Sequence, residues 1–142
     1  MHTALTTQLE AAVLTLVGHG ALKDRLCAAY TDHLDDLRTH DLPEEVQREF
    51  AAMNRTMHAA RALPGDSVVR ASVRKFSNEQ AQAYAALIVR AYVLRVQNVA
   101  ATAVGAARVG AAARAAANAP PALLALEGGS ARVVHAKRLR NT

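Results

Sequence analysis

Alanine dominates one stretch of the chain and restricts what that stretch can fold into. Of the 21 residues from 99 to 119, twelve are alanine and none is proline. Alanine has the highest helix propensity of all residues, so this composition strongly favours helix. We therefore expect one long helix that starts near residue 78 and ends before Pro120 and Pro121. Gly105 and Gly110 weaken that helix by about 1 kcal/mol each and are the points where it could break.

Hydrophobic residues recur at helical spacing in four earlier segments. Apolar positions separated by three and four residues predict helices over 7–17, 21–37, 44–62 and 67–76. We find no convincing strand pattern. The sequence therefore predicts an all-α fold, a compact bundle of four to five helices followed by the long alanine-rich helix and a basic tail. The expected division is a helical core domain at 1–98, an alanine-rich helical extension at 99–119 and a Pro/Gly-punctuated tail at 120–142.

Short polar residues ahead of these segments predict where the helices begin. Thr7 and Glu10 have the spacing of a capping box, and so do Ser77 and Gln80. Asp41 is placed to cap the third helix with a side-chain oxygen, and either Asp66 or Ser67 is placed to cap the fourth.

Charge is divided unequally along the chain. Residues 1–66 carry six Lys or Arg and ten Asp or Glu, a net charge of −4. Residues 67–142 carry eleven Lys or Arg and two Glu, a net charge of +9. A basic surface is typical of proteins that contact an acidic partner or nucleic acid. The alternative is that the two halves neutralise one another within the fold.

Eight basic residues are the candidate contacts for nucleic acid or an acidic partner. They are Arg70, Arg74, Lys75, Arg108, Arg114, Lys137, Arg138 and Arg140. The first three are concentrated on one predicted helix, so they are the strongest of the set. Residues 68–92 can be read as a helix-turn-helix, but the second helix starts with Glu79, Gln80 and Gln82 rather than with basic groups.

The alanine-rich helix also offers a second kind of surface. Small residues let two helix backbones approach closely, so they can form a tight helix–helix contact. The residues that would line such a seam are Val99, Ala103, Ala106, Ala107, Gly110 and Ala113. The alternative is a marginal helix that frays into a linker.

The residues give little support for metal binding, catalysis or a membrane span. The six histidines and Cys27 lack the spacings of a zinc site, and no serine or cysteine has an identifiable base partner. We therefore expect no cofactor, no bound metal, no small-molecule substrate and no enzymatic activity. No stretch of about 18 uncharged apolar residues predicts a membrane span. The single cysteine excludes an intrachain disulfide and is compatible with a reducing compartment.

Two functional hypotheses remain from the sequence. The run from Leu42 to Phe50 resembles a segment of small helical bacterial proteins with no assigned activity, and it transfers no function. The first hypothesis is a non-enzymatic interaction or regulatory protein, bacterial and cytoplasmic, that acts through helix surfaces on a protein partner or on itself. The alternative is a nucleic-acid-binding accessory protein that uses the basic C-terminal half.

Overall fold

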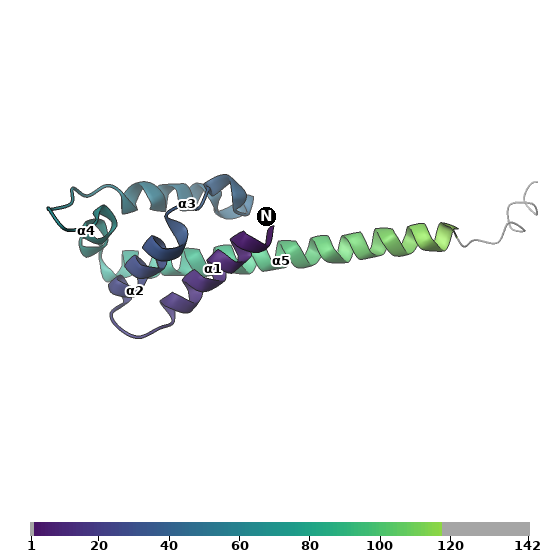
Figure 1. Cartoon of the computed structure of the whole chain (residues 1–142), viewed down its shortest axis with the longest axis horizontal. Helices are drawn as coiled ribbons and strands as arrows, with labels where there is room; N and C mark the ends of the chain where they lie inside the picture. The colour runs from purple at the N-terminus through teal and green to yellow at the C-terminus, as the bar shows by residue number, and fades with distance from the viewer. Residues whose placement is uncertain (1, 118–142) are drawn as a thin grey trace, which may run out of the picture. The chain divides into compact units, whose positions relative to one another are not determined.

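All regular secondary structure within residues 2–117, the part that this computed structural model describes, is helical (Figure 1). This part contains five α-helices, one π-helix and one 3-10 helix, with turns and loops between them. In chain order the elements are α1 (His2–Leu16), α2 (Leu22–Ala29), the π-helix η1 (Tyr30–Leu34), the 3-10 helix η2 (Thr39–Asp41), α3 (Glu44–Met57), α4 (Val68–Arg74) and α5 (Asn78–Ala117). The predicted all-α class and the long C-terminal helix are confirmed, and α5 continues through both glycines.

The predicted apolar faces form the core of the first unit of the chain, Met1–Ala100. On α3 the four large apolar residues at helical spacing are fully buried: Val46, Phe50, Met53 and Met57. On α5 the buried residues are Ala81, Leu87, Ile88 and Ala91. Val17 is an exception, because it follows the last residue of α1 and is exposed. Within this unit α1 packs against α2 and η1, while α4 packs against α2 and α3.

Serine side chains cap two of the helices as the sequence predicts. Ser67 Oγ accepts a hydrogen bond of 3.0 Å from the Arg70 N–H at the start of α4. Ser77 Oγ accepts one of 3.0 Å from the Gln80 N–H at the start of α5. Each bond satisfies one of the free backbone donors at a helix start.

Two other predicted caps are wrong. Helix α1 begins before Thr7, whose hydroxyl donates instead to the carbonyl of Thr3, 2.9 Å away within the same helix. Asp41 belongs to η2, and Pro43 occupies the N-cap position of α3 without a side-chain hydrogen bond. Helix α1 begins earlier than predicted, so Thr7 lies inside it. Helix α3 begins at Glu44 as predicted, but Asp41 lies two residues before the N-cap position, which is too early for its side chain to cap the helix.

The expected helix over 21–37 changes type part of the way along. After Ala29 the backbone becomes π-helical, and the Asp35 N–H donates to the Tyr30 carbonyl, five residues earlier, at 2.9 Å. The wider turn keeps Tyr30 and Leu34 buried. It also places Asp35 one π-helical turn after Tyr30, and both residues belong to the polar cluster described below.

The chain divides within α5 into two compact units, Met1–Ala100 and Ala101–Thr142. In the described part of the second unit, 101–117, every residue is exposed except Gly110, which is partly buried. The predicted boundaries at 98 and 119 stay predictions, and the segment 120–142 lies outside the described residues.

Candidate interaction surfaces

Of the three basic residues at α4, Arg70 and Arg74 line the same hollow, whereas Lys75 lines a different one. Arg74 Nη1 lies 2.7 Å from Oδ2 of Asp66, whose side chain is only 15% exposed. This ion pair holds Arg74 against the loop that precedes α4. Lys75 lines a separate hollow of about 270 Å³ together with Thr56, Phe76 and other residues. Unlike Arg74, Arg70 and Lys75 form no ion pair among the described residues.

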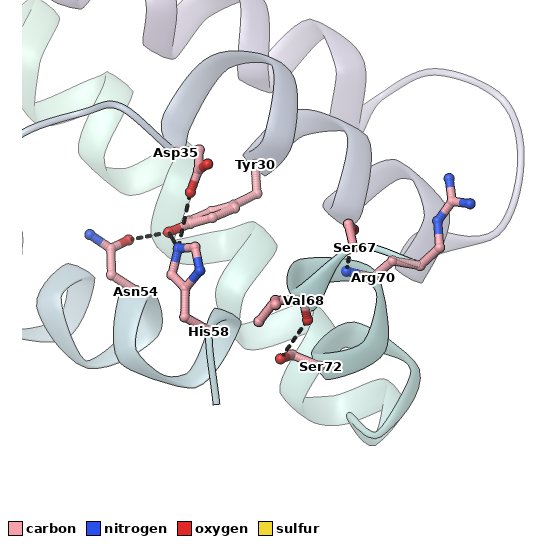
Figure 2. Close-up of polar contacts among 8 residues, drawn as sticks. All are labelled: Tyr30, Asp35, Asn54, His58, Ser67, Val68, Arg70 and Ser72. Atoms are coloured by element: carbon pink, nitrogen blue, oxygen red, sulfur yellow. Dashed lines mark hydrogen bonds and ion pairs between the residues drawn. The ribbon is translucent and has the colours of Figure 1, made fainter. Parts of the chain in front are cut away.

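Arg70 lies in a groove between α2 and α4. Figure 2 shows its backbone bonded to Ser67 and its side chain extending from α4. The groove comprises two adjoining hollows of about 460 and 520 Å³, which share Asp24, Cys27 and Arg70. The charged residues along it are three cations and three carboxylates: Lys23, Arg70, Arg74, Asp24, Asp32 and Asp66. Because the two signs balance, this groove lacks the uniformly positive potential that attracts a phosphate backbone.

The remaining predicted contact residues lie elsewhere. Arg108 and Arg114 are exposed on the second part of α5, and Arg114 Nε donates to the Gly110 carbonyl at 3.3 Å. Lys137, Arg138 and Arg140 lie outside the described residues. Of the described members of the set, Arg70 and Arg74 line one hollow, Lys75 lines another, and Arg108 and Arg114 belong to the second unit.

Two ion pairs join the acidic and basic halves of the sequence. One is Asp66–Arg74, and the other joins Glu49 of α3 to Arg90 of α5. Both are exposed to some degree, so each contributes at most about 1 kcal/mol to stability. The unequal charge distribution of the sequence is thus neutralised in part within the fold.

A polar cluster that the sequence did not reveal connects η1 with α3. The Tyr30 hydroxyl donates to Asn54 Oδ1 at 3.1 Å and lies 3.3 Å from His58 Nε2. The same nitrogen lies 3.0 Å from Asp35 Oδ1 (Figure 2). Because a carboxylate can only accept, Nε2 of His58 must carry the proton in that pair. The rings of Tyr30 and His58 also meet edge to face, with centroids 5.9 Å apart.

The surroundings of the tyrosine change its acidity. Burial raises the pKa of Tyr30 to about 12, and the negative charge of Asp35 acts in the same direction. Both effects disfavour the tyrosinate form. The residues of the cluster bond to one another, so we interpret the cluster as a structural contact that connects η1 with α3. Among the described residues no group of three His, Cys, Asp or Glu is placed to hold a metal ion.

Exposed large hydrophobic residues are concentrated on α5. Of the ten large hydrophobic side chains exposed in the described residues, six belong to this helix: Val89, Val93, Val96, Val99, Val104 and Val109. By length and composition α5 is also the one helix within residues 2–117 that could cross a membrane. The expectation that no segment spans a membrane therefore stays a prediction.

Comparisons with protein-family models, with curated proteins and with solved structures gave no match for this chain.

Proposed function

We propose that this chain is a non-enzymatic interaction protein that associates with itself through the exposed apolar residues of α5. In this proposal the helices of the first unit form a compact bundle that supports the start of α5. The observation that carries the proposal is the exposure of six valines on that helix. Exposed apolar side chains that are aligned along one element are typical of interaction sites.

The energetics favour burial of this surface. Fully burying a valine side chain is worth about 1.5 kcal/mol or more, so covering several of them supplies a substantial driving force. The segment 101–117 contains only Arg108 and Arg114 as charged residues. It therefore lacks the paired charges of opposite sign that stabilise an isolated solvated helix. Contact with another apolar helix would stabilise this segment in place of such charge pairs.

A second protein surface fits this helix better than a lipid bilayer does. The longest stretch of α5 without a charged residue is 96–107, which is twelve residues. A membrane-spanning helix needs about 20 predominantly apolar residues. Arg95 and Arg108, on either side of that stretch, would each add a cost of about 2.5 kcal/mol or more near the bilayer centre.

Nucleic-acid binding is less well supported than self-association. Arg74 is paired with Asp66, and Arg70 shares its groove with three carboxylates. We also propose that the protein is bacterial and cytoplasmic. The support for a reducing compartment is Cys27, a thiol that is free and partly exposed.

Light scattering on the full-length protein tests the proposal. We expect a mass above that of the 15.1 kDa monomer for the unmodified chain. The double variant Val96→Glu, Ala103→Glu should give the monomer mass, because it places two charges among the exposed apolar residues of α5. A matched control is Leu14→Glu, which changes an exposed apolar residue on α1 and should leave the mass of the assembly unchanged.

A sedimentation experiment with lipid vesicles distinguishes binding to a protein surface from binding to lipid. A monomeric chain that sediments with phosphatidylcholine vesicles would replace self-association by membrane binding. A monomeric chain that does not sediment would contradict the proposal altogether.

A further inference from the structure

The groove between α2 and α4 carries opposite charge at its two ends. The first hollow is lined by two cations that do not line the second, Lys23 and Arg74. The second hollow is lined by two carboxylates that do not line the first, Asp32 and Asp66. The charged residues that line both hollows are one of each sign, Asp24 and Arg70. The groove is therefore basic at one end and acidic at the other.

Only part of this charge is neutralised within the fold. Asp66 and Arg74 form an ion pair with one another. The other four charged residues of the groove form no ion pair among the described residues: Lys23, Asp24, Asp32 and Arg70. An unpaired cation, Lys23, thus remains at the basic end, and an unpaired carboxylate, Asp32, remains at the acidic end.

The space in the groove suits a ligand larger than a single ion. The two adjoining hollows measure about 460 and 520 Å³, and ligand sites in proteins typically measure about 300–1,000 Å³. Between the charged side chains the groove is lined by small or apolar residues: Ala28, Cys27, Val73 and Gly65. These leave room for an uncharged backbone to lie along the groove.

The separation of the unpaired charges sets the length of the ligand. Lys23 and Asp32 are nine residues apart along α2 and η1, which corresponds to roughly 13 Å along the helix axis. An extended chain advances by about 3.3–3.6 Å per residue, so about four residues cover the same distance. A free amino acid carries its ammonium and carboxylate on one carbon atom and cannot reach both ends.

A ligand with a single charge would meet repulsion as well as attraction in this groove. An anion drawn to Lys23 shares its hollow with Asp24, and a cation drawn to Asp32 shares its hollow with Arg70. A chain with a carboxylate at one end and an ammonium at the other complements both ends at once. Charge complementarity of this kind selects one class of partner over another.

We propose that the groove between α2 and α4 binds a short extended peptide with free ends, with its carboxylate near Lys23 and Arg70 and its ammonium near Asp32. All residues of the groove belong to the first unit, and none belongs to α5. The inference is therefore independent of self-association through α5, and either proposal can fail without the other.

Calorimetric titration of the full-length protein with tetraalanine tests this proposal. Two matched peptides carry one charge each: tetraalanine amide has only the ammonium, and N-acetyl-tetraalanine has only the carboxylate. We expect saturable binding of tetraalanine and about fivefold weaker binding of each blocked peptide, the effect of one partly exposed ion pair. Tetraalanine should also slow the alkylation of Cys27 by iodoacetamide, because this thiol lines both hollows.

Two substitutions assign the ends of the peptide. Arg70→Ala should weaken the binding of tetraalanine by about fivefold and leave the binding of the amide unchanged, because the amide has no carboxylate to pair. Asp32→Asn should weaken the binding of tetraalanine and leave that of N-acetyl-tetraalanine unchanged. Lys75→Ala is the matched control, since Lys75 lines a different hollow, and it should change neither affinity.

Three results would overturn the proposal. The first is binding of the blocked peptides as tight as that of tetraalanine, because the charged ends would then play no part. The second is an equal loss of affinity in Lys75→Ala and Arg70→Ala. The third is the absence of both calorimetric binding and Cys27 protection at millimolar tetraalanine. Self-association is decided separately by the mass of the assembly without peptide.

Discussion

The hydroxyl of Tyr30 donates a hydrogen bond of 3.1 Å to Oδ1 of Asn54, a residue 24 positions later on α3. Tyr30 is almost fully buried, so its hydroxyl depends on partners from the protein. This bond, together with the contact between His58 and Asp35, connects the π-helix to α3. Much of the stability of the first unit should depend on that connection.

Removing the amide of Asn54 should leave the buried hydroxyl with one partner fewer. We expect Asn54→Ala to lower the free energy of unfolding by about 1–3 kcal/mol. The same change in a Tyr30→Phe background should cost clearly less, because no hydroxyl is then left unsatisfied. Urea denaturation of the four proteins in this double-mutant cycle measures the difference. Equal costs in both backgrounds would show that the bond does not couple the two residues.

The acidity of Tyr30 predicts how stability depends on pH. Its folded pKa of about 12 exceeds the ordinary value of about 10. In the unfolded chain the tyrosine loses its proton first, so the folded state binds more protons at alkaline pH. The contribution of Tyr30 is therefore complete below pH 10 and is lost as the pH rises toward 12. The total change should be on the order of 2–3 kcal/mol.

Denaturant midpoints measured from neutral pH to pH 11.5 check this dependence. Tyr30→Phe should flatten the alkaline decline relative to the unmodified protein. An identical decline in both proteins would contradict the assignment.

The different roles of Arg70 and Arg74 can be separated by substitution. Arg74→Ala breaks the pair with Asp66 and should lower the free energy of unfolding by a few tenths to about 1 kcal/mol. Arg70→Ala removes a side chain that has no ion pair within the described chain, and its effect should stay within about 0.5 kcal/mol. Thermal or urea unfolding measures both. A larger loss for Arg70→Ala would show that its side chain stabilises the groove.

Gly105 of α5 should accept a larger residue. Nothing lies within 4 Å of a Cβ added at Gly105. Gly105→Ala should therefore raise helix stability by about 1 kcal/mol and leave the self-association of the chain intact. Circular dichroism and light scattering measure the two effects, and a lower helix content or a lower mass for the variant would contradict this expectation.

Local patterns were enough to predict much of this fold. The face of α3 that contains Phe50 and Met53 follows directly from helical periodicity. Ser67 and Ser77 cap the helices that they precede, because capping depends only on residues within one turn. The continuous α5 follows from its alanine content and its lack of proline.

Features that depend on distant residues could not be predicted. The π-helical turn at Tyr30 is the clearest case, because the hydrophobic spacing of 21–37 suits an ordinary helix equally well. His58 and Asp35 meet only after η1 and α3 have packed together. The pair between Glu49 and Arg90 likewise joins residues that are 41 positions apart. For the same reason the sequence could not show that Lys75 lines a different hollow from Arg70 and Arg74.

Sedimentation equilibrium of the full-length protein over a range of concentrations tests the central claim most directly. Self-association through α5 predicts a mass that rises with concentration toward twice the 15.1 kDa of one chain. The Val96→Glu, Ala103→Glu variant should remain near the mass of one chain at the same concentrations. A mass of one chain for the unmodified protein at every concentration would contradict the claim.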